Sequence, residues 1–237
     1  MIYFNGDSFT YGQDLDNRHS DGFPTLISEE NKIGYVNDAL PSSSNERIFL
    51  NTLSFLLQNL SLDVTYIIGW SYIDRRFESI YDDGSFKLVN LIPNEDHSKN
   101  TKYRNKIQKF LFNNFEGSKL NSIRLISYMI SLQSLFNEHK KKYLFWSVYD
   151  DFEKIYNDCK GVDIGVGDYS DQKTSTMRDV KSMWNFLDKS RIVKLSLYDF
   201  LKQRNPSDVF VEKNKHMGVR SHILWSDYLL TYLNNVY

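Results

Sequence analysis

Two runs of consecutive apolar and aromatic residues constrain the fold of this chain most strongly. They are residues 63–70, which read Asp-Val-Thr-Tyr-Ile-Ile-Gly-Trp, and residues 143–148, which read Tyr-Leu-Phe-Trp-Ser-Val. A strand with one solvated face carries polar residues at alternate positions, whereas an uninterrupted apolar run is typical of a strand buried on both faces. The two runs therefore predict a sheet that is covered on both sides.

Strand-like and helix-like patterns alternate along the rest of the chain. Short strands are expected at residues 1–5 and 35–37, and residues 191–197 read as a strand or as the lead into a short helix. Apolar residues at helical spacing predict helices at residues 44–60, 120–142, 178–189 and 221–235. Because strands that alternate with helices usually pair in parallel, this order predicts an α/β domain with a mainly parallel sheet.

Two stretches, about 79–105 and 150–176, interrupt the alternation and read as irregular. The chain has 237 residues and shows no internal repeat and no composition break, so we expect a single domain over 1–237 with these stretches as excursions. Long loops in compact domains are more often functional than idle. We therefore expect the two excursions to flank a pocket and to set its specificity.

Charge and cysteine content exclude several classes of protein. The net charge of −1 argues against a general nucleic-acid-binding protein, and the single cysteine, Cys159, excludes an internal disulfide and a multi-cysteine zinc site. No apolar run is long enough to span a bilayer, and no N-terminal stretch has the basic start and apolar run of a signal peptide. We therefore expect a protein that is cytoplasmic at synthesis and binds neither nucleic acid nor membrane.

The first twelve residues contain the strongest functional signal. An apolar strand, Met-Ile-Tyr-Phe, runs into Asn-Gly-Asp-Ser-Phe-Thr-Tyr-Gly at residues 5–12. Ser8 would lie at the carboxyl end of the first strand, where open α/β sheets bind ligands. Backbone N–H groups at the start of the following helix would suit a developing oxyanion. The alternative is a simple turn in which a serine caps a helix.

The other end of the chain supplies a candidate base. Residues 214–229 read Asn-Lys-His-Met-Gly-Val-Arg-Ser-His-Ile-Leu-Trp-Ser-Asp-Tyr-Leu, with His216 just before the final predicted helix. A serine nucleophile needs a base that removes its proton, and a loop at this position can return to the strand ends. The alternative for His216 is a surface loop histidine. His222 falls on the helix itself, so we expect it to pack or to cap.

Together the two ends resemble the SGNH (GDSL) hydrolase superfamily, which has Gly-Asp-Ser near its N-terminus and an Asp-x-x-His-Pro or Asp-x-His-Pro element before a final helix. More narrowly, Gly-Asp-Ser-Phe-Thr-Tyr-Gly looks like the small SGNH-type proteins carried by bacteriophages. The resemblance spans nearly the whole chain as short islands. It implies a three-layer αβα sandwich with a mainly parallel, flavodoxin-like sheet. It also implies that Ser8 is the nucleophile and His216 the base.

The element around His216 departs from the superfamily pattern. The acid expected three or two residues earlier is replaced by Lys213 and Asn214, and the following proline is replaced by Met217. The side-chain oxygen of Asn214, or a backbone carbonyl, could orient the imidazole without supplying charge. Because loss of the acid's charge slows triad enzymes strongly, the activity is expected to be slow or absent.

Three further residues match superfamily positions that donate to the oxyanion. Ser42 stands where related proteins have a glycine whose N–H donates, and Asn45 is a further candidate donor. Ser71 stands where the superfamily has an asparagine, and a hydroxyl donates with less reach than an amide. The alternative for Ser44 and Asn45 is a helix cap.

The resemblance implies a serine ester hydrolase that acts through an acyl-Ser8 intermediate on small acyl esters, such as acetyl, of a carbohydrate. Its partner would be a small-molecule or polysaccharide ester, and it implies no metal and no organic cofactor. Two alternatives stay open: a catalytically weak or inactive binding or structural protein of a phage particle, and an acyltransferase. A phage product could later be assembled into the virion or released by lysis. The natural substrate and the oligomeric state stay open as well.

Overall fold

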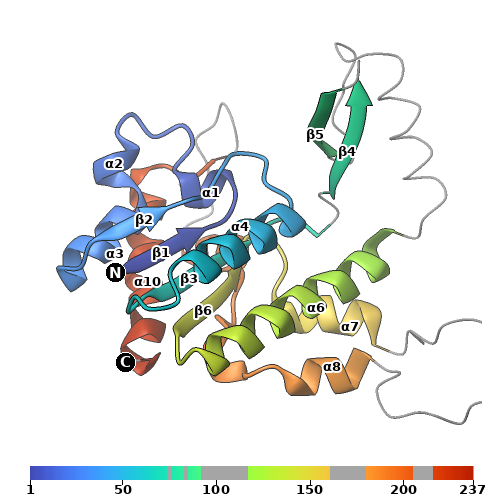
Figure 1. Ribbon diagram of the computed structural model, residues 1–237. Helices are drawn as coiled ribbons and strands as arrows, with labels where there is room; N and C mark the ends of the chain where they lie inside the picture. Colours follow the sequence, from blue (N-terminus) through green and yellow to red (C-terminus); the bar gives the residue numbers. More distant parts are fainter. Residues whose placement is uncertain (74–75, 83–84, 92–116, 161–179, 205–215, 237) are drawn as a thin grey trace, which may run out of the picture.

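The computed structural model describes residues 1–73, 76–82, 85–91, 117–160, 180–204 and 216–236 (Figure 1). In this part of the chain four parallel strands form a sheet in the order β2-β1-β3-β6. They are β1 (Ile2–Asn5), β2 (Tyr35–Asn37), β3 (Thr65–Trp70) and β6 (Lys142–Ser147).

A parallel bridge between Phe145 and Ile192 continues the sheet beyond β6. Counted along the chain, the strand order is therefore 2-1-3-4 with Ile192 at a fifth position, which is the flavodoxin-like order. The predicted α/β fold with a mainly parallel sheet is confirmed. In such a sheet the chain order reverses at β1, so the carboxyl ends of β1 and β3 flank the point where ligands usually bind.

Helices connect the strands and cover both faces of the sheet. They are α1 (Ser8–Tyr11), α2 (Arg18–Asp21), α3 (Phe23–Asn31), α4 (Asn45–Gln58), α6 (Gly117–Glu138), α7 (Phe152–Cys159), α8 (Val180–Phe186), α9 (Leu197–Arg204) and α10 (Val219–Val236). Figure 1 shows α4 and α6 on the near side of the sheet and α10 on the far side. The predicted helices at 44–60, 120–142, 178–189 and 221–235 are confirmed with shifted ends.

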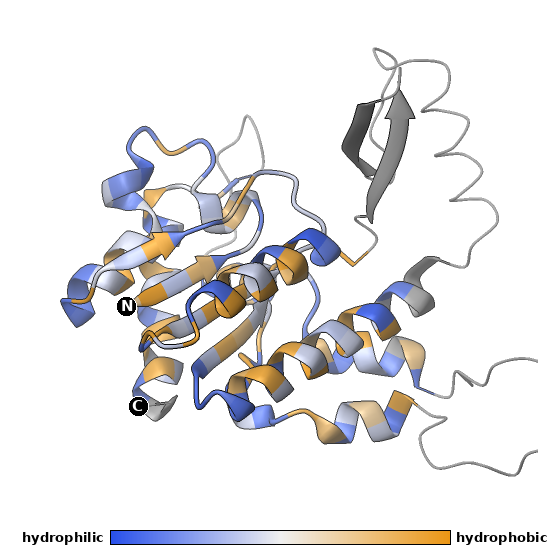
Figure 2. Ribbon diagram, viewed as in Figure 1, coloured by the Kyte–Doolittle hydropathy of each residue, from blue (hydrophilic) through white to orange (hydrophobic). Residues whose placement is uncertain are grey.

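Side chains alternate between the two faces of the sheet, as the pleat requires. On β3, Tyr66, Ile68 and Trp70 contribute to a core that α4, α6, α7 and α8 complete. Ile67 contributes to a second core, with α3, α9 and α10. Both faces of β3 are therefore buried, and Figure 2 shows apolar residues along the strands of the sheet.

Both stretches that read as irregular contain regular structure, so that part of the prediction is wrong. Residues 76–91 include an antiparallel pair, β4 (Arg76–Asp82) and β5 (Ser85–Leu91), which Figure 1 shows apart from the main sheet. The sequence signal was Asp-Gly at 83–84, a dipeptide that favours two-residue hairpin turns. Residues 92–105 lie outside the described part of the chain.

The second stretch begins with helix α7. Its buried side chains, Phe152, Ile155 and Cys159, recur at helical spacing, and the Asp151 side chain caps its start by accepting a hydrogen bond from Lys154 N at 2.7 Å. The helix has only eight residues, so its pattern is hard to detect in a polar stretch. Residues 161–176 lie outside the described part, and the expectation that the excursions flank the pocket stays a prediction.

Candidate active site

Asp7, and not Ser8, caps the helix that follows β1. Its carboxylate Oδ1 accepts a hydrogen bond from Phe9 N at 3.1 Å, so α1 begins at Ser8. Gly6 lets the chain turn tightly here, because a Cβ at this position would lie 2.1 Å from Thr10 Oγ1. The alternative in which the serine itself caps the helix is therefore wrong. The Ser8 hydroxyl is therefore not used to cap the helix, and the residue is 4% exposed.

Asp7 also joins α1 to the end of β3. Ser71 Oγ donates to Asp7 Oδ2 at 2.6 Å, and Asp7 is fully buried. Asn45, at the start of α4, holds the backbone of Ser71: Ser71 N donates to Asn45 Oδ1 at 2.8 Å, and Asn45 Nδ2 donates to Ser71 O at 3.3 Å. Ser71 and Asn45 thus fasten the strand end, and their predicted role as oxyanion donors stays a prediction.

Ser42 lies in a loop that is fastened beside the end of β1. Asp38 N donates to Phe4 O at 2.9 Å, and Leu40 N donates to Gly6 O at 3.3 Å. Ser42 has a φ of 63°, a left-handed conformation that favours glycine, in agreement with its position in the superfamily pattern. Among the described residues, the N–H groups of Ser42 and Ser8 make no hydrogen bond. Both are therefore free to donate to a ligand.

His216 is paired with a carboxylate. Its Nδ1 lies 2.6 Å from Oδ2 of Asp14, and the two side chains are 19% and 24% exposed. The imidazole also lies against Phe9, with the ring centroids 5.4 Å apart. An ionised carboxylate only accepts hydrogen bonds, so this contact places a proton on Nδ1 and leaves the Nε2 lone pair free.

Asp14 comes from the loop between α1 and α2. Gly12, with a φ of 77°, ends α1 in the left-handed conformation, and Asp14 itself has a φ of 68°. Non-glycine residues rarely adopt such angles, and those that do cluster at functional sites. Figure 2 shows this segment as mainly polar.

Sequence reasoning missed Asp14. The superfamily pattern has its acid two or three residues before the histidine, which here are Asn214 and Lys213, and both lie outside the described residues. The available signal was a polar loop with two acids directly after the nucleophile turn, at Asp14 and Asp16. Nothing in the sequence alone joins that loop to a histidine 202 positions away.

The contact between nucleophile and base is not closed. Among the described residues no hydrogen bond joins the Ser8 hydroxyl to the His216 ring. The ring lies against Phe9, the residue next to Ser8 in α1. Catalytic hydrogen bonds often tighten only when the substrate binds, so this geometry neither completes nor excludes a serine–histidine pair.

A row of aromatic rings extends from the same edge. Tyr149, which follows β6, meets Phe9 edge to face at a centroid distance of 5.7 Å. Tyr72, which follows β3, and Tyr198, on α9, lie 5.8 Å and 6.4 Å from Tyr149. Tyr72 and Tyr198 are 37% and 36% exposed, so the end of the row that is farther from His216 is partly accessible.

His222 holds α10 against α3. Its Nδ1 accepts a hydrogen bond from Phe23 N at 3.1 Å, and its ring stacks on Phe23. The residue is fully buried, and this burial lowers its pKa to about 4, against a smaller opposing effect of Asp21. The prediction that His222 is a packing or capping residue is confirmed.

Two kinds of feature are absent from the described part of the chain. No group of three or more His, Cys, Asp or Glu side chains there is arranged to hold a metal ion. No helix among those residues is long and apolar enough to cross a membrane. Cys159, at the end of α7, is buried and forms no disulfide.

Comparison with known proteins gives a family without an assigned activity. The sequence matches the model described as "Family of unknown function (DUF6071)" over residues 12–180, a region that contains Asp14 but neither Ser8 nor His216. No curated protein matches the sequence.

Solved structures reveal the fold that this chain shares. One protein assigned to the lipolytic G-D-S-L family, from Desulfitobacterium hafniense, has a TM-score of 0.52 and 10% identity, with 98% of each chain covered. The psychrotrophic esterase EstA from a Pseudoalteromonas species, inhibited by monoethylphosphonate, has a TM-score of 0.51 and 9% identity, covering 99% of this chain and 96% of EstA. TesA has a TM-score of 0.51 and 10% identity, covering 100% and 99%. The chain thus has the G-D-S-L hydrolase fold, while the narrower resemblance to phage proteins stays a prediction.

Proposed function

The chain belongs to the Family of unknown function (DUF6071), and from its fold and site we propose that it is a serine ester hydrolase. Ser8 is the nucleophile, His216 the base, and Asp14 the acid that orients the base. The observation that carries the proposal is the 2.6 Å contact between His216 Nδ1 and Asp14 Oδ2, beside the helix that begins at Ser8. The fold shared with G-D-S-L proteins supports the same reaction class.

The reaction consists of two acyl transfers. In the first, Ser8 Oγ attacks the ester carbonyl carbon while its proton passes to His216 Nε2, and the tetrahedral intermediate expels the alcohol, which takes that proton. In the second, His216 removes a proton from water, the resulting hydroxide attacks the acyl-Ser8 carbonyl, and the acid leaves as Ser8 regains its proton. The N–H groups of Ser8 and Ser42 are the proposed oxyanion donors.

Asp14 supplies what the element around His216 lacks. A carboxylate on Nδ1 fixes the tautomer whose Nε2 accepts a proton, and it stabilises the imidazolium that then forms. With Asp14 in this role, the activity does not depend on an acid at position 213 or 214. Asn214 therefore becomes dispensable as an orienter.

The substrate proposed is a small acyl ester, such as an acetyl ester, of a carbohydrate. The support is the row of tyrosines that Phe9 connects to His216, in which Tyr72 and Tyr198 are partly exposed. A phenol ring offers an apolar face for the C–H face of a sugar and a hydroxyl for its polar groups. A simple aliphatic ester would not need such a row.

A second candidate is a binding protein that retains the fold without catalysis. The observation that favours it is the open contact between Ser8 and His216 in the described residues. Ser71 adds to it, because its hydroxyl already donates to Asp7 rather than toward a ligand.

Hydrolysis of p-nitrophenyl acetate and of an acetylated oligosaccharide tests the two candidates. Wild type should release acetate, whereas Ser8→Ala and His216→Ala should not. Ser20→Ala, a change of an exposed serine on α2, should behave as wild type and serves as the matched control. Acetate that appears on an added acceptor sugar instead of in solution would indicate an acyltransferase. A folded wild type that is inactive on both esters would favour the binding protein.

A further inference from the structure

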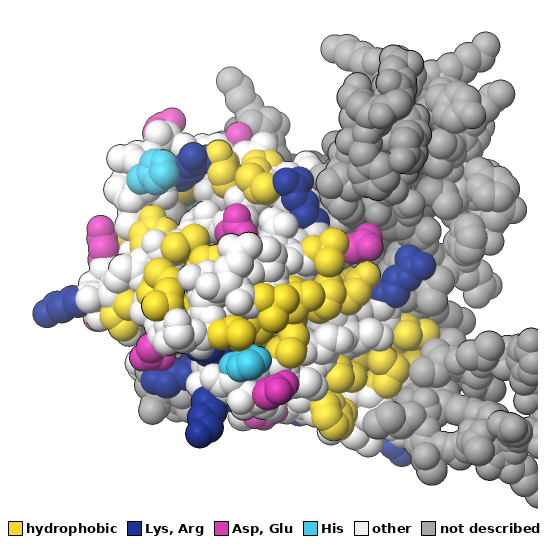
Figure 3. Space-filling model, viewed as in Figure 1, with side chains coloured by type: hydrophobic (Ala, Val, Ile, Leu, Met, Phe, Trp, Pro, Cys, Tyr) yellow, Lys and Arg dark blue, Asp and Glu magenta, His cyan; other side chains and the backbone are white. Residues whose placement is uncertain are grey.

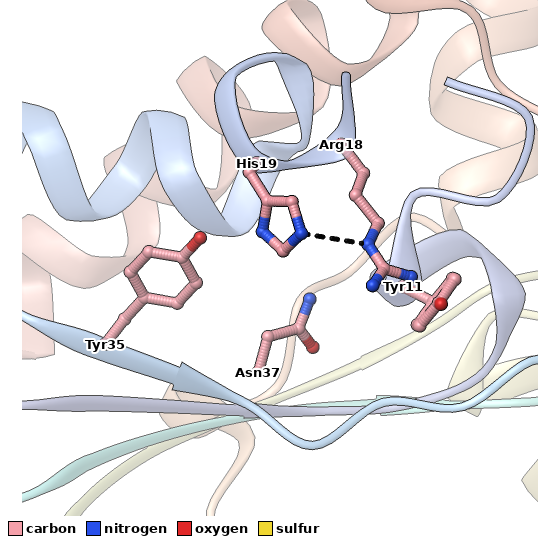
Figure 4. A pocket seen from close by; sticks show the side chains of 5 residues that line it. All are labelled: Tyr11, Arg18, His19, Tyr35 and Asn37. Atoms are coloured by element: carbon pink, nitrogen blue, oxygen red, sulfur yellow. Dashed lines mark hydrogen bonds between the residues drawn. The ribbon is translucent and has the colours of Figure 1, made fainter. Parts of the chain in front are cut away.

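A hollow lies beside Tyr11, the last residue of α1. It has a volume of about 260 Å³ and is lined by side chains from α1, α2 and β2: Tyr11, Arg18, His19, Tyr35 and Asn37 (Figure 4). In Figure 4 the side chains from α2 and those from β2 face one another across the hollow. Tyr11 ends the helix that begins at Ser8, so the hollow and the candidate active site share one short element.

The cation of this hollow is held in place without a carboxylate. The Arg18 guanidinium lies 4.0 Å over the ring of Tyr11, and its Nε–H donates to His19 Nε2 at 3.4 Å. Among the described residues, Arg18 pairs with no acid. Two neighbours thus restrict the plane of the guanidinium, while its four terminal N–H donors have no partner in that part of the chain. Figure 3 shows histidine and basic side chains next to each other over α2.

The opposite wall is also fixed by hydrogen bonds. The hydroxyls of Tyr35 and Thr25 lie 2.6 Å apart, and Asn37 Nδ2 donates to Thr10 O at 3.0 Å. Asn37 Oδ1 also accepts from Ala39 N at 3.2 Å. The hollow is therefore largely pre-formed, which lowers the entropic cost of binding a ligand.

We propose that this hollow binds a pyranose that carries a carboxylate, a uronate residue. The carboxylate accepts a bidentate pair of hydrogen bonds from the terminal nitrogens of Arg18, a geometry that the planar guanidinium matches. The sugar ring lies between the stacked Arg18 and Tyr11 side chains and Tyr35, whose phenol ring suits its C–H face. A volume of about 260 Å³ is sufficient for one such ring.

The position beside α1 makes the hollow a subsite for an acidic polysaccharide. That role rests on the proposed ester hydrolysis, with the scissile ester on a neighbouring sugar at Ser8. Binding of the uronate does not depend on it, because none of the lining residues is part of the proposed catalytic group. Failure of one proposal is therefore distinguishable from failure of the other.

Nuclear magnetic resonance titration of the wild-type chain tests the binding. Glucuronate should shift the backbone amides of Arg18, His19 and Asn37, and glucuronamide, which has the same size and no charge, should bind at least about tenfold more weakly. Sulfate and acetate should not reproduce the pattern of shifts. No shifts with glucuronate, or equal shifts with glucuronamide, would overturn the proposal. Equal shifts with sulfate would mean that the hollow is a simple anion site, and would overturn its assignment to a sugar.

Variants of Arg18 locate the effect. Arg18→Gln should weaken glucuronate binding about tenfold. Arg18→Lys should bind more weakly than wild type and more tightly than Arg18→Gln, because lysine keeps the positive charge but not the bidentate geometry of the guanidinium. Arg124→Gln, on the exposed side of α6, is the matched control and should bind as wild type. If ester hydrolysis fails while these results hold, the hollow is a sugar-binding site without the proposed catalysis.

Discussion

Two histidines near the start of α10 have opposite environments. His216 is 19% exposed as a side chain and has its Nδ1 on the Asp14 carboxylate, so its Nε2 lone pair is free. His222 is fully buried and has its Nδ1 lone pair on the N–H of Phe23, so its proton lies on Nε2. One ring can take up a proton from a neighbour, whereas the other has no lone pair left to do so. The partner of Nδ1, more than the spacing in a motif, distinguishes the proposed base His216 from the packing residue His222.

The largest expected effect separates the two histidines by what each substitution impairs. His216→Ala should lower ester hydrolysis at least about 1,000-fold and change the free energy of unfolding less than His222→Ala does, because the His216 side chain is 19% exposed. His222→Ala should leave the rate per folded molecule intact and lower the free energy of unfolding by about 2–4 kcal/mol, since it opens a cavity and strands Phe23 N–H. Initial rates and urea unfolding measure the two quantities. If both substitutions impair the same quantity, either the rate or the free energy of unfolding, the contrast between the two histidines is wrong.

Asp14 is the next largest test. Asp14→Asn should lower kcat by about 100-fold or more with little change in KM, because an amide has no negative charge to stabilise the imidazolium and can also donate to Nδ1, which favours the wrong tautomer. Asp16→Asn, two residues later on the exposed part of the same loop, is the matched control and should retain full activity. Equal rates for Asp14→Asn and wild type would mean that the carboxylate only fastens the loop.

The pH dependence of stability should report His222. Burial lowers the pKa of His222 to about 4, below its ordinary 6.5, so between these values the unfolded chain binds the proton more readily. The contribution of the buried, neutral His222 to the free energy of unfolding is therefore present in full above pH 6.5. It is lost as the pH falls toward 4, by about 3 kcal/mol in all. Urea unfolding from pH 7.5 to 4 should show this loss in wild type.

The control for that experiment keeps the hydrogen bond and removes the titration. In His222→Asn the amide oxygen can still accept from Phe23 N, and the loss between pH 6.5 and 4 should shrink by about 3 kcal/mol. A wild type and a variant with parallel pH curves would show that the histidine does not titrate on unfolding.

The smallest expected effect concerns Asp21. Its negative charge raises the pKa of His222 slightly, against the larger effect of burial. Asp21→Asn should therefore lower the pKa of His222 further, by a fraction of a unit, in an imidazole chemical-shift titration. A rise in the pKa of His222 would instead mean that the negative charge of Asp21 does not act on the imidazole.

Sequence patterns sufficed for the parts of the molecule that local physics determines. Residues 63–70 and 143–148 are apolar because both sides of each strand are covered, and this shows in the composition of a single short segment. The Gly-Asp-Ser turn is equally local, because Gly6, Asp7 and Ser8 adjoin one another in a strand-to-helix turn. The predicted fold and the position of Ser8 at the end of β1 follow from these signals.

The parts that sequence did not reveal depend on contacts between distant segments. Asp14 contacts His216 from a loop in which Gly12 and Asp14 itself adopt left-handed angles, and no residue pattern marks that path. Ser71 matched a donor position in the motif, yet its hydroxyl donates to Asp7, a partner that only the packed strand ends supply. Short amphipathic elements such as α7 are missed for another reason, since eight residues contain too few repeats.

Mapping of a covalent adduct tests the central claim most directly. The protein would be incubated with a fluorophosphonate, digested, and examined by mass spectrometry, in parallel with His216→Ala, His222→Ala and Asp14→Asn. We expect one adduct on Ser8 in wild type and in folded His222→Ala, none in His216→Ala, and slow formation in Asp14→Asn. An adduct on another residue, or none on folded wild type, would contradict the assignment of Ser8 as a nucleophile activated by His216.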